Sequence, residues 1–269
     1  MAQKVNAILF RRSLNSYEWD YKYVKSNKEE YSSILYKNLE IKKYFHKLFE
    51  TRGFFILTLK LELFKSELII HISFLKNFQE STKTNKKEEL SKIINKSIIT
   101  VLNDYYNKKI NITIKLYDLN KSFEDNISKF KNNRFEYNKL LKKLRVIRNY
   151  PLYPHLIKLV LIIITNKKSS KLLAETLAYL ITNQKRKHNN ILMFFKKSFD
   201  VLINSKMSVI QGIRILISGR INGFPRAKSR LLKFGSLPLQ SIESYVDYYE
   251  SKAYTPNGTF GIKVWVCQK

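Results

Sequence analysis

The glycines and prolines of this 269-residue chain gather near its C-terminal end. Six of the seven glycines and three of the five prolines fall within residues 212–266, whereas the first 211 residues hold a single glycine. Glycine and proline are the residues that specify tight turns. Between them the chain alternates apolar and polar residues, as half-buried strands do. We therefore expect short strands joined by sharp turns in this region.

A local excess of positive charge lies in the same region. Residues 212–242 contain six lysines or arginines and no acidic residue. An alternating apolar stretch leads into a tight turn at residues 219–223, and basic side chains follow the turn. This arrangement suits contacts with a phosphate backbone, which position a protein without reading bases. The predicted RNA-binding residues of this segment are Arg214, Arg220, Arg226, Lys228, Arg230 and Lys233.

The whole chain is also strongly basic. Its 50 lysines and arginines against 21 acidic residues give a formal net charge of +29. The two abundant polyanionic surfaces in a cell are nucleic acid and anionic membrane, and we favour nucleic acid. A hydrophobic content of 44% with 13% aromatic residues is sufficient for folded cores. The length is that of two modest domains.

Several classes of protein are disfavoured by composition. The longest strongly apolar run, residues 156–164, is interrupted by Lys158 and is shorter than the roughly 20 residues that cross a bilayer as a helix. It is interpreted as a buried helix or strand, and no membrane partner is expected. A single cysteine, Cys267, excludes a disulfide framework and a thiolate metal cluster. No cofactor and no metal are expected.

The start of the chain bears on where the protein is made. Residues 1–6 show neither the apolar region of a signal peptide nor an amphipathic presequence. The chain is rich in Lys, Asn, Ile, Phe, Tyr and Leu and poor in Gly, Ala, Pro and Arg, the bias of an AT-rich genome. Organellar genomes are commonly AT-rich, although some nuclear genomes share the bias. We therefore predict an organelle-encoded protein.

The N-terminal part, residues 1–120, predicts a small α+β domain. Apolar residues recur at helical spacing over residues 29–49 and 90–106, and strand-like runs occupy residues 54–63, 67–75 and 110–117. The order helix, strand, strand, helix, strand is that of a type II KH domain, a fold that binds single-stranded RNA. The Gly-x-x-Gly clamp of that fold is missing, since residues 78–83 contain no glycine. The prediction is thus a degenerate type II KH-like domain.

The rest of the chain divides into a linker and a second domain. Residues 121–168 are predicted to be a basic inserted linker, with a merely solvated basic face as the alternative. Residues 169–269 are predicted to form two helices, 170–183 and 190–204, packed on a small, mainly antiparallel sheet of strands 210–218, 239–254 and 260–267. The Asn257-Gly258 pair predicts a hairpin. Further RNA contacts are expected from the helices and the segment between them, namely Lys185, Arg186, Lys187, Lys196 and Lys197.

The motifs of the C-terminal half resemble the small-subunit ribosomal protein three family in its mitochondrial form. The beginning of the chain also resembles the N-terminal signature of that family, through residues 1–6 and Arg11. The C-terminal segments that carry the resemblance are Gly212-Ile213-Arg214, residues 218–223, Ala227-Lys228, Pro238-Leu239-Gln240, Asp247-Tyr248, Ala253-Tyr254 and residues 255–266.

The resemblance implies a structural protein in the head of the small ribosomal subunit that catalyses no reaction. Its partners would be small-subunit rRNA, mRNA and neighbouring head proteins. In that family, basic residues on the second helix of the C-terminal domain line the channel where mRNA enters and help to open its secondary structure. Lys196 and Lys197 occupy two of those positions. The implied location is the ribosome of the mitochondrial matrix, with the plastid as the alternative.

Other functions were weighed against this one. An RNA-processing enzyme would need clustered carboxylates or a histidine beside a nucleophile, but the four histidines, His46, His71, His155 and His188, are scattered. No catalytic residue is therefore expected. A stand-alone basic RNA-binding regulatory protein is the main alternative. A peripheral membrane protein comes third, because residues 190–204 would form an amphipathic helix with a basic polar face.

Overall fold

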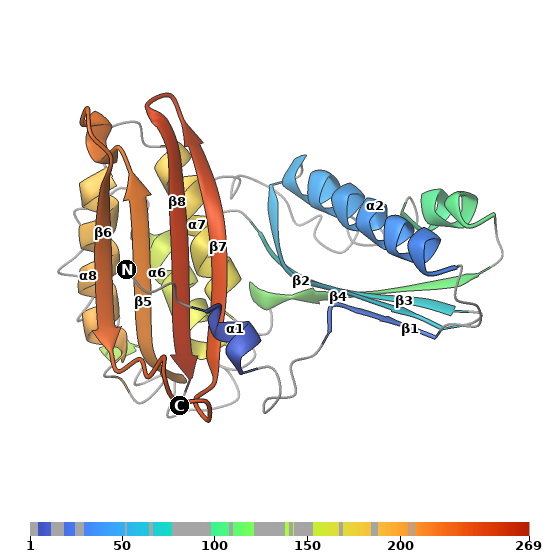
Figure 1. The fold of residues 1–269 in the computed structure, drawn as a ribbon, viewed down its shortest axis with the longest axis horizontal. Helices are drawn as coiled ribbons and strands as arrows, with labels where there is room; N and C mark the ends of the chain where they lie inside the picture. The colour runs from blue at the N-terminus through green and yellow to red at the C-terminus, as the bar shows by residue number, and fades with distance from the viewer. Residues whose placement is uncertain are drawn as a thin grey trace. The chain divides into compact units, whose positions relative to one another are not determined.

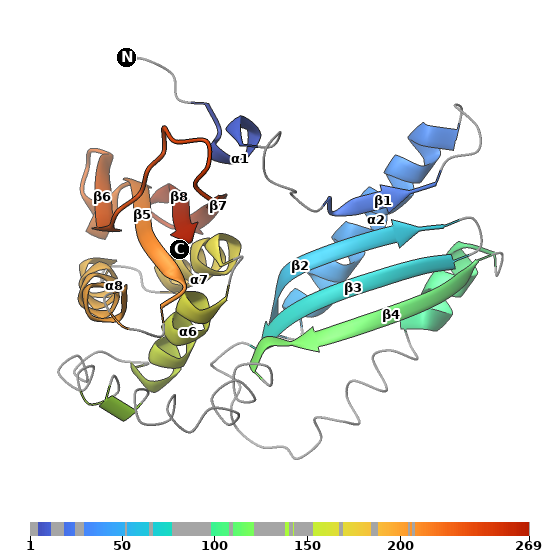
Figure 2. The ribbon, with the colours of Figure 1, turned by 90° about the horizontal axis from the view of Figure 1, so that it is seen from below.

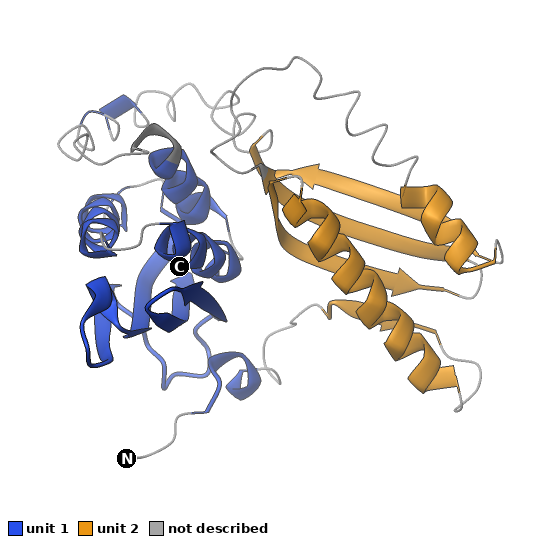
Figure 3. Cartoon of the chain, turned by 90° about the horizontal axis from the view of Figure 1, so that it is seen from above, with its two compact units in different colours: residues 1–17, 124–269 blue, residues 18–123 orange. Residues whose placement is uncertain are grey.

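The computed structural model describes residues 5–11, 19–24, 30–51, 53–64, 67–76, 98–107, 110–120, 138–139, 142, 153–166, 169–183, 188–203, 205 and 208–268. The chain forms two compact units (Figure 3). One consists of residues 18–123, and the other combines residues 1–17 with residues 124–269. Each unit contains a four-stranded sheet.

The N-terminal unit follows the predicted order of helices and strands. It contains β1 (Tyr21–Tyr23), α2 (Glu30–Thr51), β2 (Phe54–Leu63), β3 (Glu67–Lys76), a helical segment at residues 98–105 and β4 (Asn111–Asp118). The sheet order is β1-β2-β3-β4. β2 and β3 form an antiparallel hairpin, whereas β1 is parallel to β2 and β4 is parallel to β3. Residues 78–83, where a KH clamp would stand, lie outside the described residues.

The core of this unit lies between the sheet and its helices, which cover the same face (Figure 3). Ile41, Phe45 and Phe49 recur every four residues along α2, so they form one stripe of the helix. They pack with Leu61 and Ile70, which are register partners on β2 and β3. The helical spacing of the aromatic residues of α2 thus places their side chains against the buried face of the sheet.

The C-terminal unit contains a fully antiparallel sheet (Figure 1). Its strands are β5 (Ile210–Gly219), β6 (Lys228–Gly235), β7 (Val246–Thr255) and β8 (Gly258–Gln268), in the order β6-β5-β8-β7. Along β8, Ile262, Val264 and Val266 are buried and Lys263 is exposed, as the alternation predicts. The buried side is covered by α7 (Ser170–Asn183) and α8 (His188–Ile203). The prediction of two helices on a small antiparallel sheet is confirmed.

A third helix, α6 (Tyr153–Thr165), also belongs to the C-terminal unit. It lies beside α7 and α8 (Figure 2), and the backbone N–H of Val209 donates to the carbonyl oxygen of its residue Ile164 at 3.2 Å. Its residues 156–164 are buried except for the partly exposed Lys158. A helix that is apolar on all sides is a buried helix. These residues were assigned to the linker from the sequence, but they form part of the core.

The strand predictions for residues 228–254 need two corrections. Residues 228–235 form the edge strand β6, which the sequence analysis interpreted only as a basic segment. β7 begins at Val246 and not at residue 239. Charged residues are common on edge strands because they discourage pairing with other chains, and here they obscured the strand pattern. Residues 237–245 form no strand, and the carbonyl oxygens of Pro238, Leu239 and Ser241 accept hydrogen bonds from Arg11 instead.

The hairpin between β7 and β8 is present, but its turn differs from the expected one. Thr255 pairs with Gly258, so the two loop residues are Pro256 and Asn257. Proline holds φ near −65°, which excludes a turn with positive φ at both loop positions. The positive φ falls on Gly258, at 122°. The glycine is therefore needed at the first residue of β8 rather than inside the loop.

The first helix, α1 (Ala7–Phe10), packs on the C-terminal sheet. It lies on the face opposite α7 and α8 (Figure 2), where Ala7 contacts the buried pair Val246 and Cys267. The sequence boundary placed this segment in the N-terminal domain, and the structure places it in the C-terminal unit. None of the helices in the described ranges is both long and apolar enough to cross a membrane.

Candidate nucleic-acid interface

The predicted cations of residues 220–233 all lie on the surface. Arg220 precedes a single turn of 3₁₀ helix at Ile221–Gly223, and Arg226 lies in the connection that leads to β6. Lys228, Arg230 and Lys233 project from β6 itself, and all five side chains are exposed. No acidic side chain of the described residues forms an ion pair with them. They therefore offer charge that is available to a polyanion.

The sheet divides these cations between its two faces. Arg230 is the register partner of Ile217, whose side chain is buried beneath the helices, so Arg230 lies on the helix side. Lys233 is the register partner of Arg214, and both lie on the opposite side. Successive residues of a strand point to opposite faces. The sequence predicts a single cationic surface over these residues, but they lie on two faces of the sheet.

α8 adds cations on the helix side. Lys196 and Lys197 are exposed, as predicted, while Phe195 and Phe199 are fully buried. α8 packs on β5 and β6, so its exposed stripe belongs to the same side of the sheet as Arg230. Asp200 lies on that stripe as well, and it reduces the local positive potential. Lys185, Arg186 and Lys187 lie outside the described residues, and nothing tests their predicted contact.

Two hydrogen bonds couple the basic turn to the start of α8. The backbone N–H of His188 donates to Asn222 Oδ1 at 3.1 Å, and the backbone N–H of Asn222 donates to His188 Nδ1 at 3.2 Å. Asn222 has φ of 56°, a left-handed conformation that asparagine tolerates. His188 is buried, and its ring packs edge-on against Phe260 at 5.1 Å. His188 is thus a structural residue that holds the Arg220 turn against α8.

Arg214 occupies a different environment from the other predicted cations. It is half-buried on the face of the C-terminal sheet opposite α7 and α8, which we call the outer face. Its guanidinium carbon lies 5.2 Å from the centre of the Trp265 ring, within cation–π range. The rings of Trp265 and Tyr248 are also 5.2 Å apart. Arg214 is therefore held in a stack that sequence reasoning did not anticipate.

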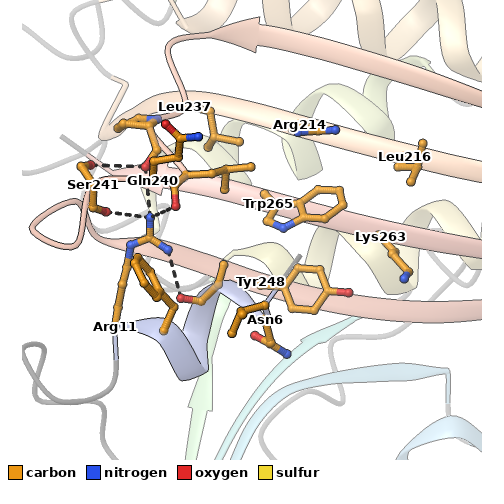
Figure 4. Close-up of a pocket in the computed structure, with 15 residues that line it drawn as sticks. Asn6, Arg11, Arg214, Leu216, Leu237, Gln240, Ser241, Tyr248, Lys263 and Trp265 are labelled. Carbon is orange, nitrogen blue, oxygen red and sulfur yellow. Dashed lines mark hydrogen bonds between the residues drawn. The ribbon is translucent and has the colours of Figure 1, made fainter. Parts of the chain in front are cut away.

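A groove runs beside this stack (Figure 4). It encloses about 1080 Å³ between the outer face, α1 and the loop at residues 237–241. Arg11 closes one end, with its guanidinium donating to the carbonyl oxygens of Ala7, Pro238, Leu239 and Ser241 at 2.8–3.0 Å. The groove was not predicted, because it joins residues more than 200 positions apart in the sequence.

The groove contains one strongly perturbed titratable group. Burial, a 3.0 Å hydrogen bond to Glu250 Oε2 and the charge of that carboxylate raise the pKa of Tyr248 to about 12. The phenol is therefore a neutral hydrogen-bond donor at physiological pH. Within the described ranges, no group of three or more His, Cys, Asp or Glu residues is placed to hold a metal ion.

Residues 191–266 match the family model described as ribosomal protein S3, C-terminal domain. This part of the chain belongs to the ribosomal protein S3 family. The S3 match covers most of α8 and all strands of the C-terminal sheet. It contains Lys196, Lys197 and the six predicted cations of residues 212–242.

Curated relatives support the same assignment. The small ribosomal subunit protein uS3 of Endomicrobium trichonymphae is 44% identical over 63 residues, which are 23% of this chain and 27% of the relative. That of Phocaeicola vulgatus is 37% identical over 75 residues, or 28% and 31% of the two chains. That of Thermosipho melanesiensis is 34% identical over 99 residues, or 37% and 46%. The chain spans less than half the length of each of these relatives.

The comparisons confirm the resemblance to the S3 family that the motifs of the C-terminal half indicate. The S3 family is structural and not enzymatic, in agreement with the prediction that this chain catalyses no reaction.

Proposed function

We propose that this chain is a structural protein of a small ribosomal subunit and binds the rRNA of that subunit through its S3 domain. The supporting observation is the S3 match over residues 191–266, whose described residues include ten exposed or half-exposed lysines and arginines. Cations on a folded surface bind phosphates largely without regard to sequence. They therefore suit the positioning of a folded rRNA.

The proposal extends to the place of the protein in the ribosome. We place it in the head of the subunit, beside neighbouring head proteins, with Lys196 and Lys197 facing the channel where mRNA enters. Two observations support this placement: both lysines are exposed on α8, and the part of α8 that carries them lies within the S3 match. The acidic Asp200 on the same stripe weakens the expected interaction with mRNA, so we expect a modest ability to open mRNA structure.

The N-terminal unit is proposed to be a degenerate KH-like domain. The order α2, β2, β3, the helical residues 98–105 and β4 supports this proposal, as does the packing of both helices on one face of the sheet. Because the sequence lacks the Gly-x-x-Gly clamp, we expect this unit to contribute less RNA affinity than the S3 domain.

The location is proposed to be the mitochondrial matrix, with the gene in the organelle. The composition typical of AT-rich genomes supports an organellar gene, and the missing Gly-x-x-Gly clamp and the long basic insertion after residue 120 favour the mitochondrion over the plastid. The alternative function, a stand-alone basic RNA-binding regulator, would differ by exchanging reversibly with RNA.

One experiment separates these two functions. Organelle lysate is sedimented through a gradient at about 0.5 M salt, at which binders held only by charge dissociate, and the chain is followed by mass spectrometry. Stoichiometric migration with the small subunit is expected for a ribosomal protein. Release to the top of the gradient would overturn the ribosomal role and favour the regulator.

A further inference from the structure

The outer face of the C-terminal sheet carries a row of four side chains across all four strands. Lys233 on β6 is the register partner of Arg214 on β5, Arg214 is the partner of Trp265 on β8, and Trp265 is the partner of Tyr248 on β7. Directly opposed residues have Cβ atoms about 4.5–5.5 Å apart. The row therefore places two cations beside two aromatic rings whose planes are tilted by 37°, all fixed by the sheet.

The outer face is positively charged. The charged residues on its strands are Arg214, Lys233, Lys252 and Lys263 against a single acid, Glu250. Lys263 is only loosely paired with Glu250, at 4.0 Å and with both side chains about half exposed. The Nε atom of Arg214 is buried and has no hydrogen-bond partner among the described residues. An anion beside the Lys233–Arg214 pair would complete these interactions.

The groove next to the row is suited to a planar group. Ligand pockets in proteins typically occupy about 300–1,000 Å³, so about 1080 Å³ is sufficient for a nucleotide. Its floor is Trp265 and Tyr248, and apolar side chains such as Leu216 and Leu237 line it (Figure 4). The amide side chains of Asn6 and Gln240 also line it. Such groups can form hydrogen bonds with the edge of a base.

We propose that the outer face binds one unpaired nucleotide of single-stranded RNA. Its phosphate lies against Arg214 and Lys233, and its base enters the groove against Tyr248 and the guanidinium plane of Arg214. Proteins recognise unpaired bases in this way, by stacking them on aromatic rings and arginine planes. The proposal rests on the proposed function, since it names a specific RNA contact of the S3 domain.

An acidic protein segment is the competing occupant, because Trp, Tyr and Arg are also common at protein interfaces. The observations favour the nucleotide for two reasons. The cations lie in line with an aromatic floor, and the amides of Asn6 and Gln240 border the groove. An acidic protein segment would pair its carboxylates with the cations, but it would make no use of the aromatic rings.

Trp265 makes this proposal testable in the full-length chain. The sequence has two tryptophans, Trp19 and Trp265, so Trp19→Phe leaves Trp265 as the single reporter. This protein is titrated with a 12-nucleotide oligouridylate at about 0.15 M salt while Trp265 emission is measured. We expect saturable quenching. Binding is recorded in parallel by the anisotropy of a labelled oligonucleotide, which detects RNA bound anywhere on the chain.

Three variants with equal charge loss decide the site. In the Trp19→Phe background, Arg214→Gln or Lys233→Gln should lower the affinity obtained from the quenching titration at least tenfold. A charge-assisted hydrogen bond of about 1.5–3 kcal/mol corresponds to a factor of ten or more in the dissociation constant. Lys252→Gln, a matched loss of charge elsewhere on the same face, should change it less than about twofold. Lys233 lies exposed on the edge strand, so its variant should fold even if Arg214→Gln does not.

The other outcomes overturn the proposal. If the anisotropy rises without any change in Trp265 emission, RNA binds elsewhere, so the outer-face site is wrong and the RNA-binding function stands. If neither signal changes, the RNA-binding function itself fails. If a synthetic peptide of alternating leucine and glutamate quenches Trp265 and the oligonucleotide does not, the groove is a protein-binding site.

Discussion

The guanidinium group of Arg11 donates a hydrogen bond to the carbonyl oxygen of Leu239, 2.8 Å away and 228 residues later in the chain. The same group donates to the carbonyl oxygens of Pro238 and Ser241, and Arg11 is fully buried. Among the described residues, its acceptors are backbone carbonyls and the Ser244 hydroxyl rather than a carboxylate. The planar fork of arginine suits several acceptors at once. Arg11 therefore fixes both α1 and the residue 237–241 loop on the outer face.

We predict that Arg11→Ala destabilises the C-terminal unit by about 3 kcal/mol or more, because an unpaired buried polar group costs about 1–3 kcal/mol and several carbonyls lose their donor. Arg11→Lys should show an intermediate loss, since it keeps the charge but not the fork. Urea unfolding followed by Trp265 emission in the Trp19→Phe background measures the effect on this unit. An exposed control, Arg226→Ala, should leave the midpoint unchanged. Equal midpoints for Arg11→Ala and the control would contradict the role of Arg11.

The bonds between His188 and Asn222 lead to a second prediction. Asn222→Ala removes the side-chain acceptor for the His188 N–H and places a Cβ-bearing residue at φ of 56°. Loss of the acceptor costs about 1 kcal/mol, and the left-handed conformation about 1–2 kcal/mol more. Asn222→Gly keeps the conformation and should lose less. The expected order of stability, measured by urea unfolding, is wild type, then Asn222→Gly, then Asn222→Ala. If the glycine variant were the less stable of the two, the left-handed backbone would not matter.

The raised pKa of Tyr248 predicts that the stability of the C-terminal unit falls at alkaline pH. Burial, the hydrogen bond to Glu250 and the charge of Glu250 raise its pKa to about 12, above the ordinary value near 10. A group whose folded pKa is raised stabilises the fold fully below the unfolded pKa, and this contribution is lost as pH rises through the folded pKa. The loss should thus occur between about pH 10 and about 12.

The measurement again uses Trp265, whose ring centre lies 5.2 Å from that of Tyr248. A tyrosinate at this distance should quench its emission, with a midpoint near pH 12 in the Trp19→Phe background. Glu250→Gln should move the midpoint down, because the carboxylate charge disappears and the hydrogen-bond acceptor becomes a neutral amide. Tyr248→Phe is the control and should abolish this transition. Its persistence would show that another group titrates near Trp265.

Local periodicity made most of the helices and strands predictable from the sequence. α7 and β8 follow clean helical and alternating patterns, and their positions agree with the expectation within two residues. The failures have physical causes. The polar start of β6 hid an edge strand, and Pro256 shifted the positive φ of the hairpin turn to Gly258. No local pattern shows that Arg11 would bind a loop 228 residues away.

The candidate site was predictable in composition but not in arrangement. The acid-free run identified the cations of residues 212–242, and their exposure agrees with that expectation except at the half-buried Arg214. Their division between two faces depends on strand register, which pairs Arg214 with Lys233 and Ile217 with Arg230. Register is set by the packing of the whole sheet. Hence the stack of Arg214 on Trp265 emerges only in the folded chain.

The cations of residues 226–230 give the last prediction, which concerns salt. The measured quantity is the slope of log affinity against log salt concentration for a transcript of the small-subunit rRNA. We expect the triple variant Arg226→Gln, Lys228→Gln, Arg230→Gln to reduce the magnitude of this slope by about 2–3, because each neutralised phosphate contributes about 0.7–0.9. The control combines Lys43→Gln, Lys47→Gln and Lys115→Gln, three exposed cations of the N-terminal unit, and should lower the slope by less than about 1. Filter binding between about 0.05 and 0.3 M salt gives both slopes. If the two triple variants lost the same slope, RNA would be held by the net charge of the chain and not by the S3 domain.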